Sequence, residues 1–368
     1  MKKIFTILAF ILSFSAVVYA QSYSIYPPSY LRKIGIDFRK FKIVGFSGNN
    51  KTLLCIEKVN NLQLRLKGYV WIIRILSFNP YNQLTGYRSV LLRTSNLDNL
   101  AINHNGTIAI LVTDYGTQIM ETNLKSGKSK ILFLHQRGKP AFVCRAFIYH
   151  YHGSFYTEGS YYNSKGYWVS DAIVRLNLNH PDSIKLFQKT WNIGKTRKSL
   201  GKMQNELVVS GRQDFLGAKK TNSPYNILYY CTPKKCVSID KSIAYGGWAA
   251  TGHRILYSAL RIKKNTKKVF RQLIVKDTET GKTWILYSGP KAYLYPYLSK
   301  DGGKVAITAT FNFKKGIMSY FYAKEQDNFK LKPFPHLQNV PLGIFRLSPN
   351  GKHYAFLNRD GLMIGTLP

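Results

Sequence analysis

A short motif returns about every fifty residues along this chain: an apolar strand, a turn centred on glycine or asparagine, and a second apolar strand. The clearest copies read LSPNGKHYAF at 347–356, LSKDGGKVAI at 298–307 and INHNGTIAI at 102–110. Weaker copies complete a series of turn centres at Asn50, Gly106, Gly153, Gln204, Gly252, Gly302 and Gly351. A near-constant period of this length is typical of the blades of a β-propeller.

One repeat can be followed in full between residues 100 and 133. Ile102 leads into the first turn, and apolar or alternating segments follow at 107–112, 118–123 and 130–133, separated by further turn sequences. Four strands joined by three turns make a four-stranded antiparallel blade. No long segment of helical period follows the first twenty residues. The predicted fold is therefore all-β, a seven-bladed β-propeller, with six or eight blades as the alternative.

The two ends of the chain indicate how such a ring closes. After Gly351 only two more strands are expected, at 353–357 and 362–367, so the last blade is one strand short. Residues 24–41, ahead of the first turn centre, include material that belongs to no complete blade. Pairing an N-terminal strand with the C-terminal blade removes both open edges, and residues between about 34 and 41 are the predicted closing strand.

The first twenty residues have the pattern of a secretory signal peptide. Lys2 and Lys3 precede an apolar run at 4–18, and a small-residue cleavage site ends at Ala20. The run is short for a membrane span, and no later apolar run is long enough for one. The residue directly after the cleavage site is Gln21 and not the cysteine that a lipid anchor needs. We expect residues 21–368 to form a single β-propeller domain that is periplasmic or secreted, without a transmembrane segment.

The chain is strongly basic, with 54 Lys and Arg against 17 Asp and Glu and a formal net charge of +37. Such a charge attracts polyanions, so an acidic glycan, lipopolysaccharide, an anionic lipid surface and nucleic acid all suit it as partners. The basic residues are spread over every predicted blade. A general compositional bias that gives solvated surface charge is therefore the competing interpretation, because focusing needs one localised patch.

The cysteines fall into two groups. Cys231 and Cys236 flank the four-residue loop of a predicted hairpin, where residues on opposite strands come within disulfide range, and an oxidising compartment favours the bond. We predict a disulfide between them, with two free thiols as the alternative. Cys55 and Cys144 lie within apolar strands and are expected to be buried thiols.

The three clearest motifs resemble the Ser-Pro-Asp-Gly-Lys repeat of TolB-like, WD40-like bacterial propellers, and Trp248 holds a position where that family often has an apolar residue before the turn. In period, the resemblance extends over nearly the whole mature chain. It implies a platform that docks proteins or accompanies a peptidase. The chain departs from both layouts, since its blades begin near residue 45, leaving no room for the N-terminal domain of TolB, and no hydrolase domain follows them. The binding role rests on fold analogy.

Two segments partly match catalytic motifs. The run Gly45-Phe46-Ser47-Gly48-Asn49 lacks the last glycine of a serine-hydrolase elbow and falls in a blade turn. The run from Asp277 to Trp284 resembles a degenerate Asp-box of sialidases and, one residue short, the tryptophan-docking motif of quinoprotein propellers. Both propeller motifs mainly brace blades and normally recur, whereas this chain has one copy. An ordinary turn with a packed tryptophan is the simpler interpretation, and no catalytic residue is predicted.

Candidate binding residues are aromatic or imidazole side chains. Tyr293, Tyr295 and Tyr297 alternate, which predicts that they share one face of a strand. Exposed tyrosines with basic neighbours suit stacking on sugars or nucleobases, or a protein hot spot; packing between blades is the alternative. The remaining candidates are Trp248, His150 and His152. The two histidines could share a metal ion, but nothing completes a site, so no metal and no cofactor are predicted.

Together these observations predict an exported, non-catalytic, monomeric propeller. It would serve as a binding or scaffold module for an envelope protein or an anionic polymer such as a glycan or lipopolysaccharide, with nucleic acid as a further polyanionic partner. The alternative is a glycan-active, sialidase-like enzyme built on the same scaffold.

Overall fold

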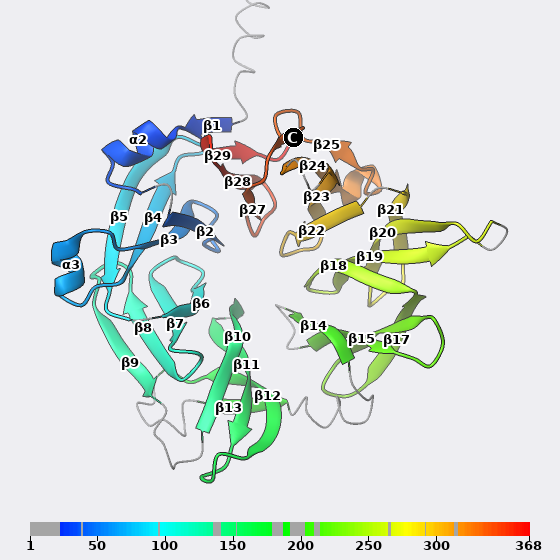
Figure 1. Ribbon diagram of the computed structural model, residues 1–368, viewed down its shortest axis with the longest axis horizontal. Helices are drawn as coiled ribbons and strands as arrows, with labels where there is room; N and C mark the ends of the chain where they lie inside the picture. The colour runs from blue at the N-terminus through cyan, green and yellow to red at the C-terminus, as the bar shows by residue number, and fades with distance from the viewer. Residues whose placement is uncertain are drawn as a thin grey trace, which may run out of the picture.

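Seven β-sheets stand in a ring around a central axis in the computed structural model (Figure 1). This confirms the predicted seven-bladed β-propeller of antiparallel, mostly four-stranded blades. The structure describes residues 23–37, 40–94, 96–134, 141–151, 153–178, 187–191, 203–209, 214–263, 266–290, 292–312 and 316–368. Within these ranges no helix is long and apolar enough to cross a membrane.

The first four blades follow one another along the chain, each with its first strand nearest the axis (Figure 1). Blade 1 contains β2 (Phe41–Phe46), β3 (Thr52–Lys58), β4 (Trp71–Phe78) and β5 (Leu84–Leu92). Blade 2 contains β6 (Leu97–Ile102), β7 (Ile108–Thr113), β8 (Gln118–Asn123) and β9 (Ser129–Leu134). Blade 3 contains β10 (Ala141–Tyr151), β11 (Ser154–Tyr162), β12 (Trp168–Leu176) and β13 (Phe187–Trp191). Blade 4 contains β14 (Met203–Val209), β15 (Asp214–Lys220), β16 (Asn226–Cys231) and β17 (Cys236–Ser242).

The last three blades complete the ring, and within the described ranges three short helices lie outside the sheets. Blade 5 contains β18 (Ala244–Thr251), β19 (Arg254–Ile262), β20 (Val269–Asp277) and β21 (Thr283–Gly289). Blade 6 contains β22 (Ala292–Leu298), β23 (Lys304–Asn312), β24 (Ile317–Lys324), β25 (Lys332–Pro333) and β26 (Val340–Pro341). Blade 7 contains β27 (Ile344–Leu347), β28 (His353–Asn358), β29 (Gly361–Thr366) and the N-terminal β1 (Tyr23–Tyr26). The helices are α2 (Pro28–Lys33), α3 (Leu62–Leu66) and the 3-10 turn η3 (Glu325–Asp327).

The ring closes through the N-terminal strand, as predicted, but the position of that strand was wrong. Strand β1 pairs antiparallel with β29, from Tyr23 opposite Gly365 to Tyr26 opposite Leu362. The described residues of the segment 34–41 do not pair there, because α2 and the turn at Gly35 precede β2, which begins at Phe41 and pairs with β3. The sequence signal lay earlier, in a short Tyr-rich strand that two prolines end, since proline cannot continue a ladder.

The turn after the first strand repeats closely around one end of the ring. In blades 1, 2, 6 and 7 a backbone N–H donates to the carbonyl five residues later, from Ser47, Asn103, Ser299 and Ser348. Further hydrogen bonds join the turns of adjacent blades: Asn49 to the carbonyl of His104, Lys300 to that of Pro349, and Asn350 to the side chain of Asn50. These bonds explain why the motif recurs, because each turn completes hydrogen bonds for its neighbour.

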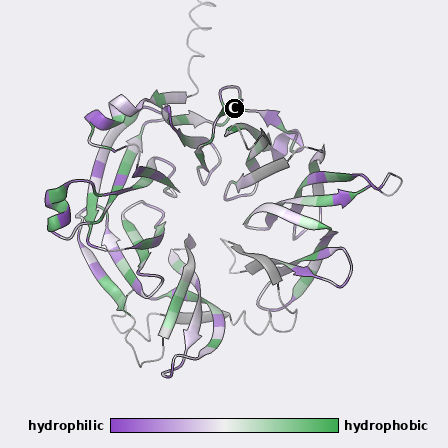
Figure 2. Ribbon diagram, viewed as in Figure 1, coloured by the Kyte–Doolittle hydropathy of each residue, from purple (hydrophilic) through white to green (hydrophobic). Residues whose placement is uncertain are grey.

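The hydrophobic cores lie between the blades. Six clusters of described residues each combine two neighbouring sheets, as where Val275 of blade 5 meets Ile307 of blade 6. Figure 2 shows the corresponding mixture of hydrophobic and hydrophilic residues along the strands. Between blades 6 and 7 the cluster is rich in aromatics, with the rings of Tyr320 of blade 6 and Phe345 of blade 7 stacked at 5.4 Å. Much of the aromatic content of the chain therefore serves inter-blade packing.

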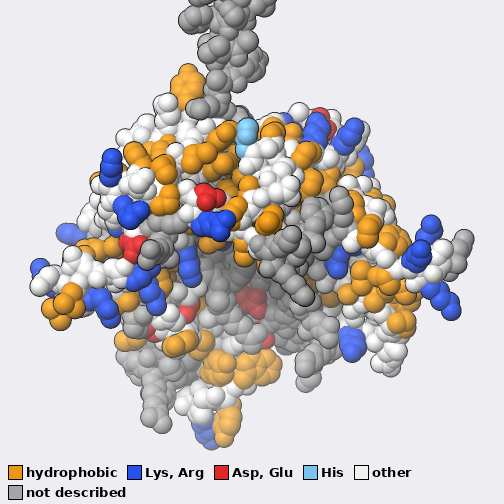
Figure 3. Space-filling view, turned by 45° about the horizontal axis from the view of Figure 1, so that its top comes forward, with side chains coloured by type: hydrophobic (Ala, Val, Ile, Leu, Met, Phe, Trp, Pro, Cys, Tyr) orange, Lys and Arg blue, Asp and Glu red, His pale blue; other side chains and the backbone are white. Residues whose placement is uncertain are grey.

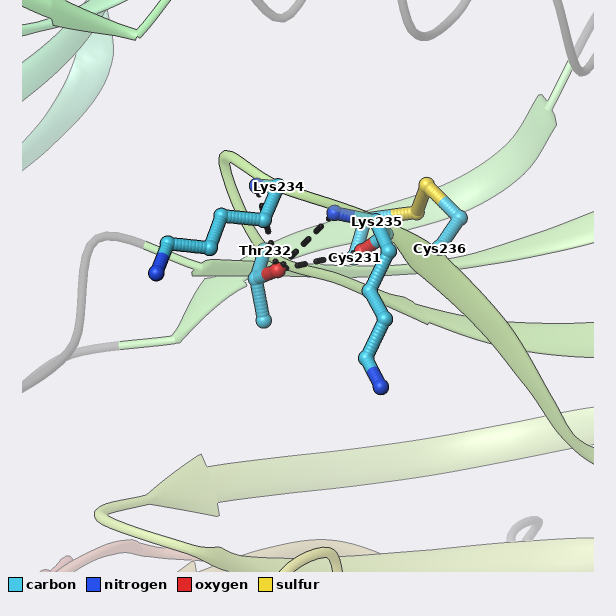
Figure 4. The surroundings of a disulfide bond; sticks show 5 residues. All are labelled: Cys231, Thr232, Lys234, Lys235 and Cys236. Carbon is cyan, nitrogen blue, oxygen red and sulfur yellow. Dashed lines mark hydrogen bonds between the residues drawn. A yellow bond between two sulfur atoms is a disulfide. The ribbon is translucent and has the colours of Figure 1, made fainter.

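Cys231 and Cys236 form the predicted disulfide (Figure 4). They stand directly opposite each other at the ends of β16 and β17, with their Cα atoms 4.0 Å apart. The hydroxyl of Thr232 accepts hydrogen bonds from the backbone N–H groups of Lys234 and Lys235 and so orders the loop between the two cysteines. Cys55 and Cys144 are buried free thiols, as expected.

Candidate functional site

A cavity of about 700 Å³ opens at the end of the central channel where the first strands run into their turns. We call it the channel mouth; its polar and turn residues include Gly48, His104, His150, Thr251, Lys300 and Arg346. Blades 1, 2, 3, 5, 6 and 7 all contribute to its wall. The repeated turn explains this, because the residues that follow Ser47, Asn103, Ser299 and Ser348 all line the cavity.

The channel mouth gathers basic side chains from four blades. His104 and His150 come from blades 2 and 3, Lys300 from blade 6 and Arg346 from blade 7. No aspartate or glutamate is among the described residues that line the cavity. The positive charges of Lys300 and Arg346 therefore line one space without a counter-charge in its described wall, which is favourable for an anion that enters it.

His150 shows the effect of this environment. Burial lowers the pKa of its imidazole, and the nearby positive charges of Lys300 and His104 lower the pKa further. The ring also packs edge-on against Phe155 at 4.9 Å between centroids. The imidazole is therefore held in place, and its protonated form is disfavoured until a negative charge is near.

Arg346 spans the boundary between blades 7 and 1. Its Nε donates to the backbone carbonyl of Val44 at 3.0 Å and one terminal nitrogen donates to the carbonyl of Phe345 at 2.8 Å. Burial raises the pKa of the nearby Tyr297 phenol, and the charge of Arg346 partly opposes that effect. Arg346 forms no ion pair with a described carboxylate. Backbone carbonyls position its guanidinium but do not neutralise it.

The first strands of six blades contain a register shift, and in β22 it overturns the predicted tyrosine stripe. Tyr293 stands opposite Ala309 and Tyr297 opposite Ala306, an odd separation that places the two positions on opposite faces of the sheet. The extra residue between Leu294 and Pro296 is Tyr295. A bulge of this kind changes the parity of the strand, so simple alternation predicted the wrong face.

The structure separates the other candidate binding residues. Tyr297 lies in the wall of the channel mouth and against the aromatic core of blades 6 and 7. Trp248 is half-buried, stacks on Tyr245 with ring centroids 6.4 Å apart and packs against the core of blades 4 and 5, which indicates a structural part. His150 lies in the channel mouth. His152 and the side chain of Tyr293 lie outside the described residues.

A second hollow, of about 550 Å³, lies between blades 6 and 7. We call it the Tyr295 groove; its wall includes Tyr295, Leu342, Ile344, Arg346, Leu357 and Arg359. It lies toward the opposite end of the first strands from the channel mouth, because it includes the start of β27 and the turn between β28 and β29. Arg346 and Tyr297 line both cavities.

The segment that resembles an Asp-box forms a brace between blades 5 and 6. Asp277 is almost fully buried and accepts hydrogen bonds from the backbone N–H groups of Glu279 and Thr280, both at 2.9 Å. It also lies 3.5 Å from Nε of Arg254, which donates two hydrogen bonds to Glu325 of blade 6, at 2.6 and 2.5 Å. We call Arg254, Asp277 and Glu325 the Arg254 brace.

Trp284 completes this arrangement. The guanidinium of Arg254 lies over its ring at 5.3 Å, and the ring packs edge-on against Phe329 of blade 6. The motif therefore uses its charges and its tryptophan for packing between blades. Ser47, of the hydrolase-like run, is also buried and donates a hydrogen bond to Asn49 within its turn.

Positive charge on the outside of the ring is dispersed. In the view of Figure 3, Lys and Arg side chains are scattered over the visible face without one contiguous patch. Many carboxylates are meanwhile engaged in ion pairs within the blades, for example Glu57 with Arg74 and Asp240 with Arg261. The described wall of the channel mouth, by contrast, brings four basic side chains to one cavity without a carboxylate beside them. Over the described residues, no group of three or more His, Cys, Asp or Glu could hold a metal ion.

Known proteins resemble this chain in fold and not in sequence. No protein-family model matches it, and no curated protein matches it in sequence. An oligogalacturonate lyase in complex with manganese is similar over 89% of this chain and 97% of its own, with a TM-score of 0.52 and 10% identity. An oligogalacturonate lyase from Vibrio parahaemolyticus covers 88% of both chains, with a TM-score of 0.50 and 8% identity.

The β-propeller domain of the Trilobed protease from Pyrococcus furiosus is also similar. The match covers 86% of this chain and 89% of that domain, with a TM-score of 0.50 and 11% identity. That domain is described as having an open velcro topology, whereas β1 closes the ring here. Since enzymes and a domain of a protease share the scaffold, the likeness shows the fold alone.

Proposed function

We propose that this chain is an exported, non-catalytic, TolB-like β-propeller that binds an anionic polymer of the cell envelope at the channel mouth. The polymer's negative groups enter the cavity and are held by Lys300 and Arg346, while His104 and His150 add charge when they are protonated. The dispersed lysines of the outer surface attract the same polymer from a distance without selecting it.

One observation carries this proposal: basic groups from four blades converge on a cavity whose described wall has no carboxylate. At an effective dielectric constant of 20, one unit charge about 4 Å from an anion contributes about 4 kcal/mol before desolvation is subtracted. Several such groups around one cavity favour a multiply charged ligand. A single exposed lysine outside the cavity is largely screened at physiological salt.

The alternative, a sialidase-like enzyme, gains no support from the geometry. Its sequence basis was the run from Asp277 to Trp284, which bonds and packs within the Arg254 brace. A sialidase departs from the usual pair of catalytic carboxylates by using a tyrosine as nucleophile, and that tyrosine works beside an acidic residue. The described wall of the channel mouth contains no acidic residue.

The test is a binding measurement with the purified mature chain and two labelled probes, lipopolysaccharide and a carboxylated polysaccharide. Lys300→Gln should weaken binding of the preferred probe by about tenfold at low salt and reduce the slope of log affinity against log salt by about one. Lys125→Gln, in an exposed turn of blade 2, is the matched control and should change little. Equal losses for the two variants would assign binding to dispersed surface charge and contradict the proposal.

A further inference from the structure

The Tyr295 groove contains an aromatic side chain that the fold does not use. Tyr295 is 57% exposed although it belongs to an inner strand. It makes no hydrogen bond and no ring stacking with the residues that the structure describes, whereas its neighbour Tyr297 packs against Phe345 at 5.2 Å between ring centroids. The groove therefore presents the phenol ring of Tyr295 to whatever enters it.

The backbone at Tyr295 makes this choice of residue unfavourable for folding alone. Its φ is +50°, in the left-handed region that side chains other than glycine rarely adopt. Blade 5 has the same register shift in its first strand, and there the bulged position is Gly247 with φ +55°. A glycine would satisfy the bulge without strain, so the tyrosine points to a use for its side chain.

The rest of the groove combines an apolar wall with positive charge. Leu342 is 57% exposed, and Ile344 and Leu357 line the same hollow. Arg359 has a side chain that is 81% exposed, and its one ion pair, to the exposed Asp360, is long at 3.9 Å. Arg346 also lines the groove. Such a long, solvent-exposed pair leaves Arg359 free to exchange partners.

We propose that the Tyr295 groove is a subsite for one acidic sugar residue of a glycan. The C–H face of the pyranose ring lies against the ring of Tyr295 and against Leu342. The carboxylate at the edge of the sugar is received by Arg359, with Arg346 behind it. The volume of about 550 Å³ is in the range of small-ligand sites.

The chemistry of a uronic acid matches this layout better than a simple phosphate or sulfate group or a neutral sugar does. A phosphate or sulfate group alone would use the arginines but leave the phenol ring and the apolar wall uncovered. A neutral sugar would use the ring but leave the arginines unpaired. Of these three ligands, only the uronic acid has both an apolar ring face and an anionic edge. The subsite shares Arg346 with the channel mouth. Tyr295 and Arg359 line only the groove, and Lys300 and the histidines line only the channel mouth, so variants at these residues test the two proposals separately.

The experiment is calorimetric titration of the mature chain with a hexasaccharide that contains glucuronic acid, beside a neutral hexasaccharide of equal length. The acidic hexasaccharide should bind more tightly than the neutral one by at least about tenfold. Tyr295→Gly and Arg359→Gln should each weaken binding of the acidic hexasaccharide by about tenfold. Tyr295→Gly should not lower the melting temperature, since glycine suits the bulge. If Tyr295 served only the fold, Tyr295→Gly would leave binding unchanged and would lower the melting temperature.

Matched controls exist in the chain. Tyr115 is also exposed, at 83%, and has a positive φ of +59°, but it lies in a turn of blade 2; Tyr115→Gly should leave binding unchanged. Arg88→Gln, on the exposed face of β5, controls for Arg359→Gln.

Equal binding of the neutral hexasaccharide, no binding at millimolar concentration, or full binding by Tyr295→Gly would each overturn the proposal. So would an acidic hexapeptide that binds more tightly than the sugar and depends on Tyr295. Loss of binding in Lys300→Gln, with full binding in Tyr295→Gly, would support the channel mouth and overturn only the groove.

Discussion

The Arg254 brace and the channel mouth both contain basic side chains, but only those of the brace are paired with carboxylates. In the brace, Arg254 meets the carboxylates of Asp277 and Glu325, so every charge has a partner and blades 5 and 6 are joined. In the channel mouth, Lys300 and Arg346 face a cavity without a carboxylate in its described wall. The difference teaches that a matched cluster contributes to stability, whereas an unmatched one costs stability and is available to bind.

Breaking the brace should have the largest effect. Arg254→Ala would leave the buried carboxylate of Asp277 with one fewer cation and would remove a link between two blades. We expect a loss of about 3 kcal/mol in the free energy of unfolding, near the lower end for a buried pair, because Glu325 is about half exposed. Urea denaturation measures it. An equal loss in Lys300→Ala would contradict the contrast between the clusters.

Acid should act on the brace next. Hydrogen bonding from Arg254 lowers the pKa of Glu325. Burial raises the pKa of Asp277, but backbone hydrogen bonds from Thr280 and Glu279 outweigh this effect, so the pKa of Asp277 is also lowered. Because the pKa values of both carboxylates are lower in the folded state than in the unfolded state, their contribution to the free energy of unfolding is complete above about pH 5. It is lost as the pH falls through the folded-state pKa values. Urea midpoints between pH 6 and pH 3 should fall less steeply in Arg254→Ala. An unchanged slope would show that other carboxylates dominate.

A carboxylate placed in the channel mouth should give its basic side chains an ion-pair partner, as in the Arg254 brace. His104→Glu would put a negative charge among Lys300, His150 and Arg346. We expect binding of the anionic polymer to fall by about tenfold while the free energy of unfolding rises by about 0.5 kcal/mol, the scale of a partly exposed ion pair. His104→Gln separates the loss of the imidazole from the gain of the charge. Unchanged binding in His104→Glu would contradict the proposal that positive charge in the channel mouth binds the polymer.

The smallest effect concerns His150. Burial and the charges of Lys300 and His104 lower the pKa of its imidazole, so removing the charge in Lys300→Gln should raise that pKa. The bound anion should raise it as well, and affinity should then increase as the pH falls from about 7 toward 5, because the complex takes up protons. NMR titration of the imidazole follows both. An affinity that rises with pH would contradict the sign.

Sequence patterns predicted the blade count, the repeated turns and the disulfide because these depend on short-range chemistry. The glycine at position 302 or 351 and the apolar strands beside it lie within one motif. The position of β1 was missed because four residues ending at two prolines give a weak strand signal. The bulge at Tyr295 was missed because a register shift is fixed by pairing with β23, which alternation in one strand does not reveal.

The channel mouth was only partly predictable. His150 was recognised as a candidate, but Lys300, Arg346 and His104 are far apart in the sequence and meet only when the ring closes. A usable signal does exist. His104 and Lys300 each follow the residue that starts the repeated turn, Asn103 or Ser299, so aligning the repeats on the turn would have placed both at the axis.

The pairing of β1 with β29 must form late in folding. It joins residues 23–26 to residues 362–365, nearly the full length of the chain apart. Each blade can form from local hairpins, but this last pairing must wait until the final strand exists, and it carries the entropy cost of closing the longest loop. A chain whose blades have all formed still exposes the edge of β29 until Tyr23 to Tyr26 arrive, and in that interval another copy's strand could take the vacant place.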